Sequence, residues 1–187
     1  MHSGKSSLIL TLLNFLDDTG AVMIDGVDSS NIPRQVSRSL VTTVSQGLAE
    51  LPGSVRFTIL PTSKDSGPVN DATLNNALER VGLLNHISSH GGLDAPLADM
   101  GLSHGQRQLL AIARAVLHKM EHNSSILFVD EAARAVDIKT ATAMQRSIDE
   151  FFGDCTTISI SHSAENIASS DIVVSISDGR ITSIVRR

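Results

Sequence analysis

Residues 126–131 read Ile-Leu-Phe-Val-Asp-Glu, a run of four apolar residues that ends in two carboxylates. A short, continuous apolar run is typical of a strand that is buried on both faces. Acidic side chains at the tip of such a strand suit phosphoryl chemistry: Asp130 would hold Mg²⁺, and Glu131 would act as general base on an attacking water. The alternative is a strand followed by the N-terminal cap of a helix.

Predicted helices and strands alternate on both sides of this stretch. Apolar spacing and helix-start signals predict helices over 8–16, 34–39, 74–81, 105–118 and 140–151. Apolar and β-branched runs predict strands at 21–24, 27, 40–44, 156–160, 171–177 and 180–185, with a loop at 88–98. The alternation predicts an α/β fold with a parallel sheet. A helical subdomain, 54–123, would be inserted into a core formed by 1–53 and 124–187.

The composition excludes several classes of protein. The chain has 187 residues, 41% of them hydrophobic, which is enough for a buried core and excludes a wholly disordered chain. With 15 Lys and Arg against 20 Asp and Glu, the net charge is -5, and we expect no nucleic-acid partner. No apolar run approaches the ~20 residues of a membrane-spanning helix. The single cysteine, Cys155, fits a reducing compartment.

The N-terminus carries a short glycine-lysine-serine motif. Gly4-Lys5-Ser6 precedes an apolar, helix-forming run and matches the last three places of the P-loop pattern, whose backbone N–H groups bind phosphate at a helix N-terminus. In that interpretation Lys5 would reach the β- and γ-phosphates, and the Ser6 hydroxyl would bind Mg²⁺. The alternative is a frayed terminus with an ordinary helix cap.

A second helix start has similar chemistry. Ser103, Gly105 and Gln106 open the amphipathic helix, where a hydroxyl and open backbone N–H groups can bind an anion. The alternative is a capped helix without a ligand. Gln46 and His162 each follow a predicted strand, and they are either ligands of the nucleotide, metal and water or structural polar groups.

Two histidine pairs, His86 with His90 and His118 with His122, have the spacing that places both rings on one helix face. No cysteine or carboxylate lies nearby with metal-ligand spacing, so solvated faces are expected rather than zinc.

Taken together, the order of P-loop, glutamine, serine-glycine-glutamine signature, Asp-Glu pair and histidine resembles the nucleotide-binding domain of ABC transporters. The resemblance covers almost the whole chain. Details such as Ile24-Asp25-Gly26-Val27-Asp28 and His104 in the signature are most similar to the second domain of C-subfamily, multidrug-resistance-associated transporters. The resemblance implies a P-loop NTPase fold, with a RecA-like core, a parallel sheet and an inserted α-helical signature subdomain.

The resemblance also implies roles for individual residues. ATP would be bound by Gly4, Lys5, Ser6, Ser7, Ser103, Gly105 and Gln106. Mg²⁺ would be held by Ser6, Gln46 and Asp130, and catalysis would depend on Glu131, His162 and Gln46. The implied partners are a second nucleotide-binding domain, paired head to tail, and the transmembrane domains of an exporter. The domain would then work at the cytoplasmic face of a membrane.

Three features depart from the family pattern. The sequence lacks the first half of the P-loop and the preceding aromatic residue that stacks on adenine, and it contains no Tyr or Trp. Ala133, Arg134 and Ala135 replace the usual serine-rich D-loop. These departures predict an N-terminally truncated domain with weak nucleotide binding. The alternatives are a non-catalytic remnant, a soluble ABC protein, and a chromosome ATPase of the SMC or Rad50 type, whose long coiled coil has no counterpart here.

Overall fold

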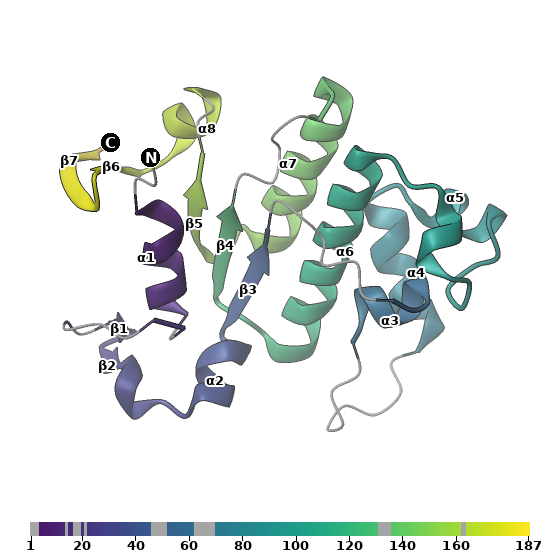
Figure 1. Ribbon diagram of the computed structural model, residues 1–187, viewed down its shortest axis with the longest axis horizontal. Helices are drawn as coiled ribbons and strands as arrows, with labels where there is room; N and C mark the ends of the chain where they lie inside the picture. Colours follow the sequence, from purple (N-terminus) through teal and green to yellow (C-terminus); the bar gives the residue numbers. More distant parts are fainter. Residues whose placement is uncertain are drawn as a thin grey trace.

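The fold is built on a small parallel sheet with helices on both faces (Figure 1). The computed structural model describes residues 4–13, 15–16, 20, 22–45, 52–61, 70–130, 136–161 and 164–187. The sheet contains three strands in the order β3, β4, β5, and both pairings are parallel. The predicted α/β fold with a parallel sheet is therefore confirmed.

The helices of the described residues are α1 (Lys5–Leu12), α2 (Arg34–Ser39), α3 (Val55–Ile59), α4 (Asp71–Arg80), α5 (Leu84–Ser89), α6 (His104–His122), α7 (Ile138–Phe152) and α8 (Ala164–Ser169). Two short 3-10 helices lie at Ser29–Asn31 and Leu97–Met100. The strands are β1 (Met23–Ile24), β2 (Val27–Asp28), β3 (Val41–Val44), β4 (Ile126–Asp130), β5 (Thr156–Ile160), β6 (Ile172–Ser177) and β7 (Arg180–Arg186).

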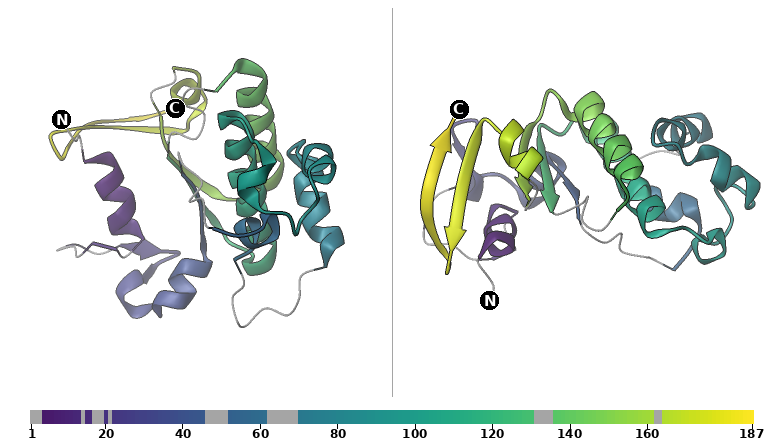
Figure 2. Two further views of the ribbon diagram at one scale, coloured as in Figure 1. Left: turned by 45° about the vertical axis from the view of Figure 1, so that its right-hand side comes forward. Right: turned by 90° about the horizontal axis from the view of Figure 1, so that it is seen from above.

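Alternate side chains of the sheet enter two separate cores. Phe128 on β4 and Val41 on β3 are buried against Ile9 of α1 on one face. Leu127 on β4 and Val44 on β3 point to the other face, where α6 and α7 cover the sheet. Successive residues of a strand point to opposite faces, so the apolar run of β4 supplies both cores. Figure 2 shows α1 on one side of the sheet and α6 with α7 on the other.

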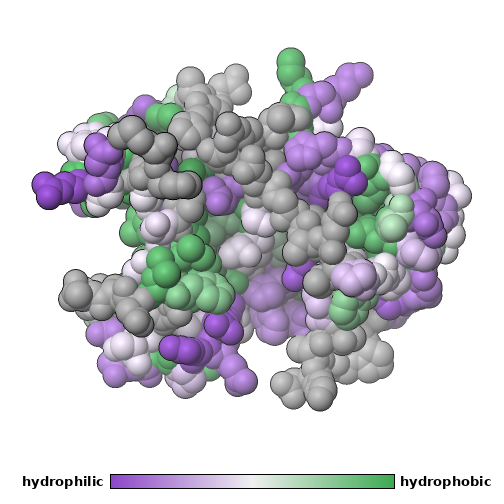
Figure 3. Space-filling model, viewed as in Figure 1, coloured by the Kyte–Doolittle hydropathy of each residue, from purple (hydrophilic) through white to green (hydrophobic). Residues whose placement is uncertain are grey.

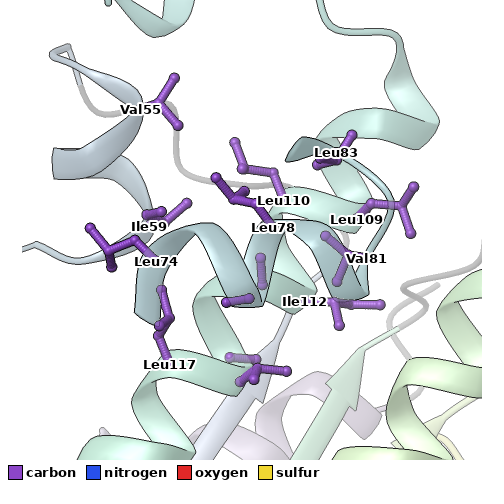
Figure 4. Packing of buried hydrophobic residues seen from close by; sticks show 14 of the residues in the cluster. Val55, Ile59, Leu74, Leu78, Val81, Leu83, Leu109, Leu110, Ile112 and Leu117 are labelled. Carbon is purple, nitrogen blue, oxygen red and sulfur yellow. The ribbon is translucent and has the colours of Figure 1, made fainter. Parts of the chain in front are cut away.

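The larger core continues into the helical region. Leu110 and Ile112 of α6 are fully buried, and Leu78 of α4 and Ile59 of α3 pack on the same cluster (Figure 4). One buried cluster therefore runs from the sheet through α6 to the shorter helices. The domain boundaries at 54 and 123 stay a prediction.

Several predicted element boundaries were wrong, among them the start of the helix predicted over 74–81, which is α4 and begins at Asp71. The first helix, predicted over 8–16, is α1 and spans Lys5–Leu12. It begins earlier because Gly4 adopts a left-handed conformation with φ 90°, which places the N-cap four residues before the apolar run that starts at Leu8. The predicted loop at 88–98 is also wrong at its start, since α5 extends to Ser89.

Two hairpins lie outside the parallel sheet. β1 pairs with β2 and β6 pairs with β7, both antiparallel, with turns at Asp25-Gly26 and Asp178-Gly179, where φ is positive. Apolar surface gathers over α1 (Figure 3), where Leu8 and Leu10 are each more than 40% exposed. No helix among the described residues has the length and apolar character needed to cross a bilayer.

Candidate nucleotide site

The carboxyl ends of the three parallel strands meet at one edge of the sheet. Val44 pairs with Val129, and Asp130 pairs with Ile160, so the predicted metal ligand Asp130 stands at the end of the central strand. In open α/β sheets, ligands bind beyond this edge. Gln46, Glu131 and His162 lie outside the described residues, and each follows the last residue of its strand by one or two positions.

The N-terminus of α1 lies beside the same edge. Gly4 is its N-cap and has no side chain that could occupy the first backbone N–H groups. Lys5 lines a groove of about 290 Å³ between β5 and β6, together with Ser159 of β5 and Ser161, which directly follows that strand. The structure therefore brings Lys5 close to the end of β5, as a phosphate site requires. Ser6 and Ser7 belong to the first turn of α1.

The turn of the β6–β7 hairpin touches this helix start. An added Cβ on Gly4 would lie 3.1 Å from the Cα of Gly179, which is the second residue of that turn. The two backbones are therefore in van der Waals contact, and only glycine fits at Gly4 because its φ is also positive.

The signature residues form a capping box at the start of α6. The Ser103 hydroxyl oxygen accepts from the Gln106 backbone N–H at 3.2 Å, and the Gln106 side-chain oxygen accepts from the Ser103 N–H at 2.9 Å. Both residues thus hold each other in place at the helix N-terminus.

Gly105 in the same turn packs against the first turn of α7. An added Cβ would lie 3.0 Å from Cγ2 of Thr140, so a larger residue would require a shift. Thr140 is itself fixed by Asp137, the N-cap of α7, whose carboxylate accepts from the Thr140 N–H at 3.0 Å and from its hydroxyl at 2.7 Å. These hydrogen bonds hold the pKa of Asp137 below its usual range. No residue spacing along the chain predicts this contact between α6 and α7.

The two predicted phosphate-binding turns lie on opposite faces of the sheet. α1 and α6 both begin near the edge to which the strands point, as Figure 1 shows. α1 belongs to the smaller core with Phe128, whereas α6 belongs to the larger core with Leu127. The sheet itself therefore separates Lys5 from Ser103.

The predicted histidine pairs also form. The rings of His86 and His90 stack at 4.3 Å between centroids, and those of His118 and His122 lie 4.5 Å apart. Within the described part of the chain, no three His, Cys, Asp or Glu side chains group as a metal site.

The family model for ABC transporters matches residues 3–134. The chain belongs to the ABC transporter family. ABC multidrug transporter B of Aspergillus fumigatus is 38% identical over 180 residues, which cover 96% of this chain and 12% of that protein. The human ATP-binding cassette sub-family C member 8 is 35% identical over 183 residues, which cover 96% of this chain and 11% of that protein. The C-subfamily resemblance is thereby confirmed.

A solved structure supports the P-loop NTPase fold. A bacterial Atm1-family ABC exporter with ATP bound superposes with a TM-score of 0.82 and 26% sequence identity, and the match covers 97% of this chain and 31% of that one. The chain spans about one eighth of the length of the fungal transporter and about a third of the exporter chain. Membership of this family implies that the domain binds ATP.

The described residues fit the phosphate end of ATP. The backbone at Gly4 and the ammonium of Lys5 supply N–H donors and positive charge at a helix N-terminus. Asp130 supplies a carboxylate at the neighbouring strand end, and carboxylate oxygen is a ligand that Mg²⁺ accepts. The binding roles of these side chains stay predictions.

Proposed function

We propose that this ABC transporter domain is an ATP-hydrolysing motor that pairs head to tail with a second nucleotide-binding domain and drives export through transmembrane domains. The observation that carries the proposal is the separation of Lys5 from Ser103 by the sheet. A nucleotide held by Gly4 and Lys5 would lie with α1, on the other face of the sheet from the signature turn of the same chain. A second domain in head-to-tail orientation would bring its own Ser103 and Gly105 to that nucleotide.

Mg²⁺, held by Ser6, Gln46 and Asp130, would neutralise charge on the phosphates. Glu131 would accept the proton of the attacking water, Gln46 would orient that water, and His162 would donate a hydrogen bond to the γ-phosphate. Work at the cytoplasmic face of a membrane follows from the same proposal, because the transmembrane domains would hold the motor there.

The proposal is tested with the Glu131→Gln variant, since an amide cannot take the proton of water. We expect steady-state phosphate release to fall by about 10²–10⁴-fold, while binding of Mg-ATP is retained. Ser103→Arg, made in the same background, should keep nucleotide binding and lose ATP-dependent pairing in size-exclusion chromatography. Phosphate release from Glu131→Gln within twofold of the parent would refute the catalytic role of Glu131. Pairing of the Ser103→Arg variant would refute the head-to-tail arrangement.

A further inference from the structure

We propose that His86, on α5, is a positioning residue for the signature turn, defined here as residues 101–106. The proposal rests on the proposed function, in which the signature turn approaches a nucleotide on the partner domain. It adds a residue that lies 15 positions before the first residue of the signature turn and that the P-loop, signature and acidic motifs do not include.

His86 contacts the chain on both sides of the turn. Its Nε2 lies 2.8 Å from the backbone oxygen of Met100, directly before the turn. Its Nδ1 lies 3.5 Å from the side-chain nitrogen of Gln106, at the other end of the turn. Between these two contacts the chain passes through Gly101, whose φ is 56°. One imidazole therefore contacts both ends of this segment.

The hydrogen-bond partners of His86 determine which ring nitrogen carries a proton. The Met100 oxygen can only accept, so His86 Nε2 must carry a proton and donate it. In the neutral ring Nδ1 then has a lone pair and accepts from the Gln106 amide nitrogen. That contact is long and weak in itself, but it selects the orientation of the amide.

With its nitrogen directed to His86, the Gln106 side chain presents its oxygen to the Ser103 N–H, where the 2.9 Å hydrogen bond of the capping box forms. A reversed amide would place two donors against each other at Ser103. His86 thus acts on Ser103 through Gln106 and holds the turn in one geometry.

The position of His86 is itself well fixed. Its neighbours Leu83 and Ile87 are each 1% exposed in the larger core, so α5 cannot rotate freely. The ring also stacks on His90, whose Nδ1 bonds to the backbone oxygen of His86 at 2.8 Å. His90 is exposed, and its side chain contacts Ser89 and His86 of α5, which makes it a matched control.

The first test measures amide hydrogen exchange at Ser103 and Gln106 in the full chain without nucleotide. His86→Phe keeps a ring that stacks on His90 but removes both polar contacts, and we expect exchange at both amides to rise about 5-fold or more, the effect of one lost hydrogen bond. His86→Gln can keep a donor at the Nε2 position and should restore exchange to within about twofold of the parent. His90→Phe should leave both amides unchanged. If His86→Phe does not fold, His86→Asn, which is too short to reach Met100, replaces it with the same expectation.

Nitrogen-15 NMR of the parent chain adds a direct readout, since the proposal requires the proton on Nε2. A proton on Nδ1 in the neutral ring, unchanged exchange in His86→Phe, or exchange in His86→Gln as fast as in His86→Phe would each overturn the proposal.

The second test uses ATP-dependent pairing in the Glu131→Gln background. His86→Phe should raise the Mg-ATP concentration for half-maximal pairing about 5-fold and leave the nucleotide affinity of the single chain within about twofold. Unchanged pairing in His86→Phe would overturn the functional part of the proposal. If the Glu131→Gln parent itself does not pair, the proposed function fails, and the exchange experiment still decides the role of His86.

Discussion

His118, a histidine of α6, should make the stability of the domain depend on pH. Its Nδ1 lies 2.9 Å from the Thr42 hydroxyl of β3, which in turn lies 2.6 Å from the hydroxyl of Ser124. Burial, then the nearby His122 and Arg114, lower the pKa of His118 to about 4. The neutral ring is therefore the form that the folded chain accepts.

The pH dependence of stability follows from the difference between the pKa of His118 in the folded and the unfolded chain. Above about pH 6.5 the ring is neutral in both states, and His118 adds no pH dependence. As the pH falls from about 6.5 towards 4, the unfolded chain binds a proton and the folded chain does not, so stability is lost. If the His118 ring were completely buried, the free energy of unfolding would fall by about 2 kcal/mol at about pH 5. Because His118 is partly exposed, we expect a loss of about 1–2 kcal/mol.

The assay compares the parent with His118→Asn, which can keep a hydrogen bond to Thr42 and cannot titrate in this range. Because the chain contains no Tyr or Trp, urea unfolding is best followed by far-UV circular dichroism. The loss of unfolding free energy between about pH 7.5 and about pH 5 should be about 1–2 kcal/mol smaller in the variant. Equal losses in the two proteins would refute the reasoning.

Two further substitutions test local contacts. Gly105→Ala should lower the free energy of unfolding by about 1–3 kcal/mol through the clash with Thr140 Cγ2. Thr140→Ser removes that methyl group and should recover part of the loss. Urea unfolding of the double variant measures this, and full additivity of the two single effects would contradict the contact. Arg56→Gln should raise the pKa of both Asp71 and Asp94, because hydrogen bonds from the Arg56 guanidinium lower both pKa values. NMR titration of the two carboxyl groups measures this, and unchanged pKa values would refute the ion pairs.

The sequence predicted elements well where a single periodicity applies. The bounds of the strand at 156–160 are those of β5, and the apolar run at 126–129 lies within β4. For β4 the reason is that Leu127 and Phe128 enter the two cores on opposite faces of the sheet, which a continuous apolar run predicts. The start of α1 was predicted too late, because Lys5, Ser6 and Ser7 are polar and do not extend the apolar periodicity of the helix. The left-handed backbone of Gly4, which begins the helix, cannot be recognised from the apolar pattern. The contacts of Thr140 with Gly105 and of His86 with Met100 join separate helices, and no spacing rule along one chain can predict them. The histidine spacing correctly predicted that His86 meets His90, but it did not predict the contact of His86 with Met100.

For the signature turn, the alternatives of a capped helix and an anion site turn out to be compatible. The capping box uses the Ser103 oxygen as an acceptor and leaves the hydroxyl proton outside the exchange of hydrogen bonds with Gln106. A hydroxyl can accept from a backbone N–H and donate to a phosphate oxygen at the same time. The cap would then hold the Ser103 oxygen in one position before any ligand arrives, which lowers the ordering cost of a contact made across a dimer. At α1 the situation is reversed: Gly4 has no side chain to satisfy the first N–H groups, so phosphate itself would complete the N-terminus. A nucleotide site between two domains would thus combine the N-terminus of α1, whose N–H groups phosphate would satisfy, with a signature turn from the partner domain that its capping box already orders.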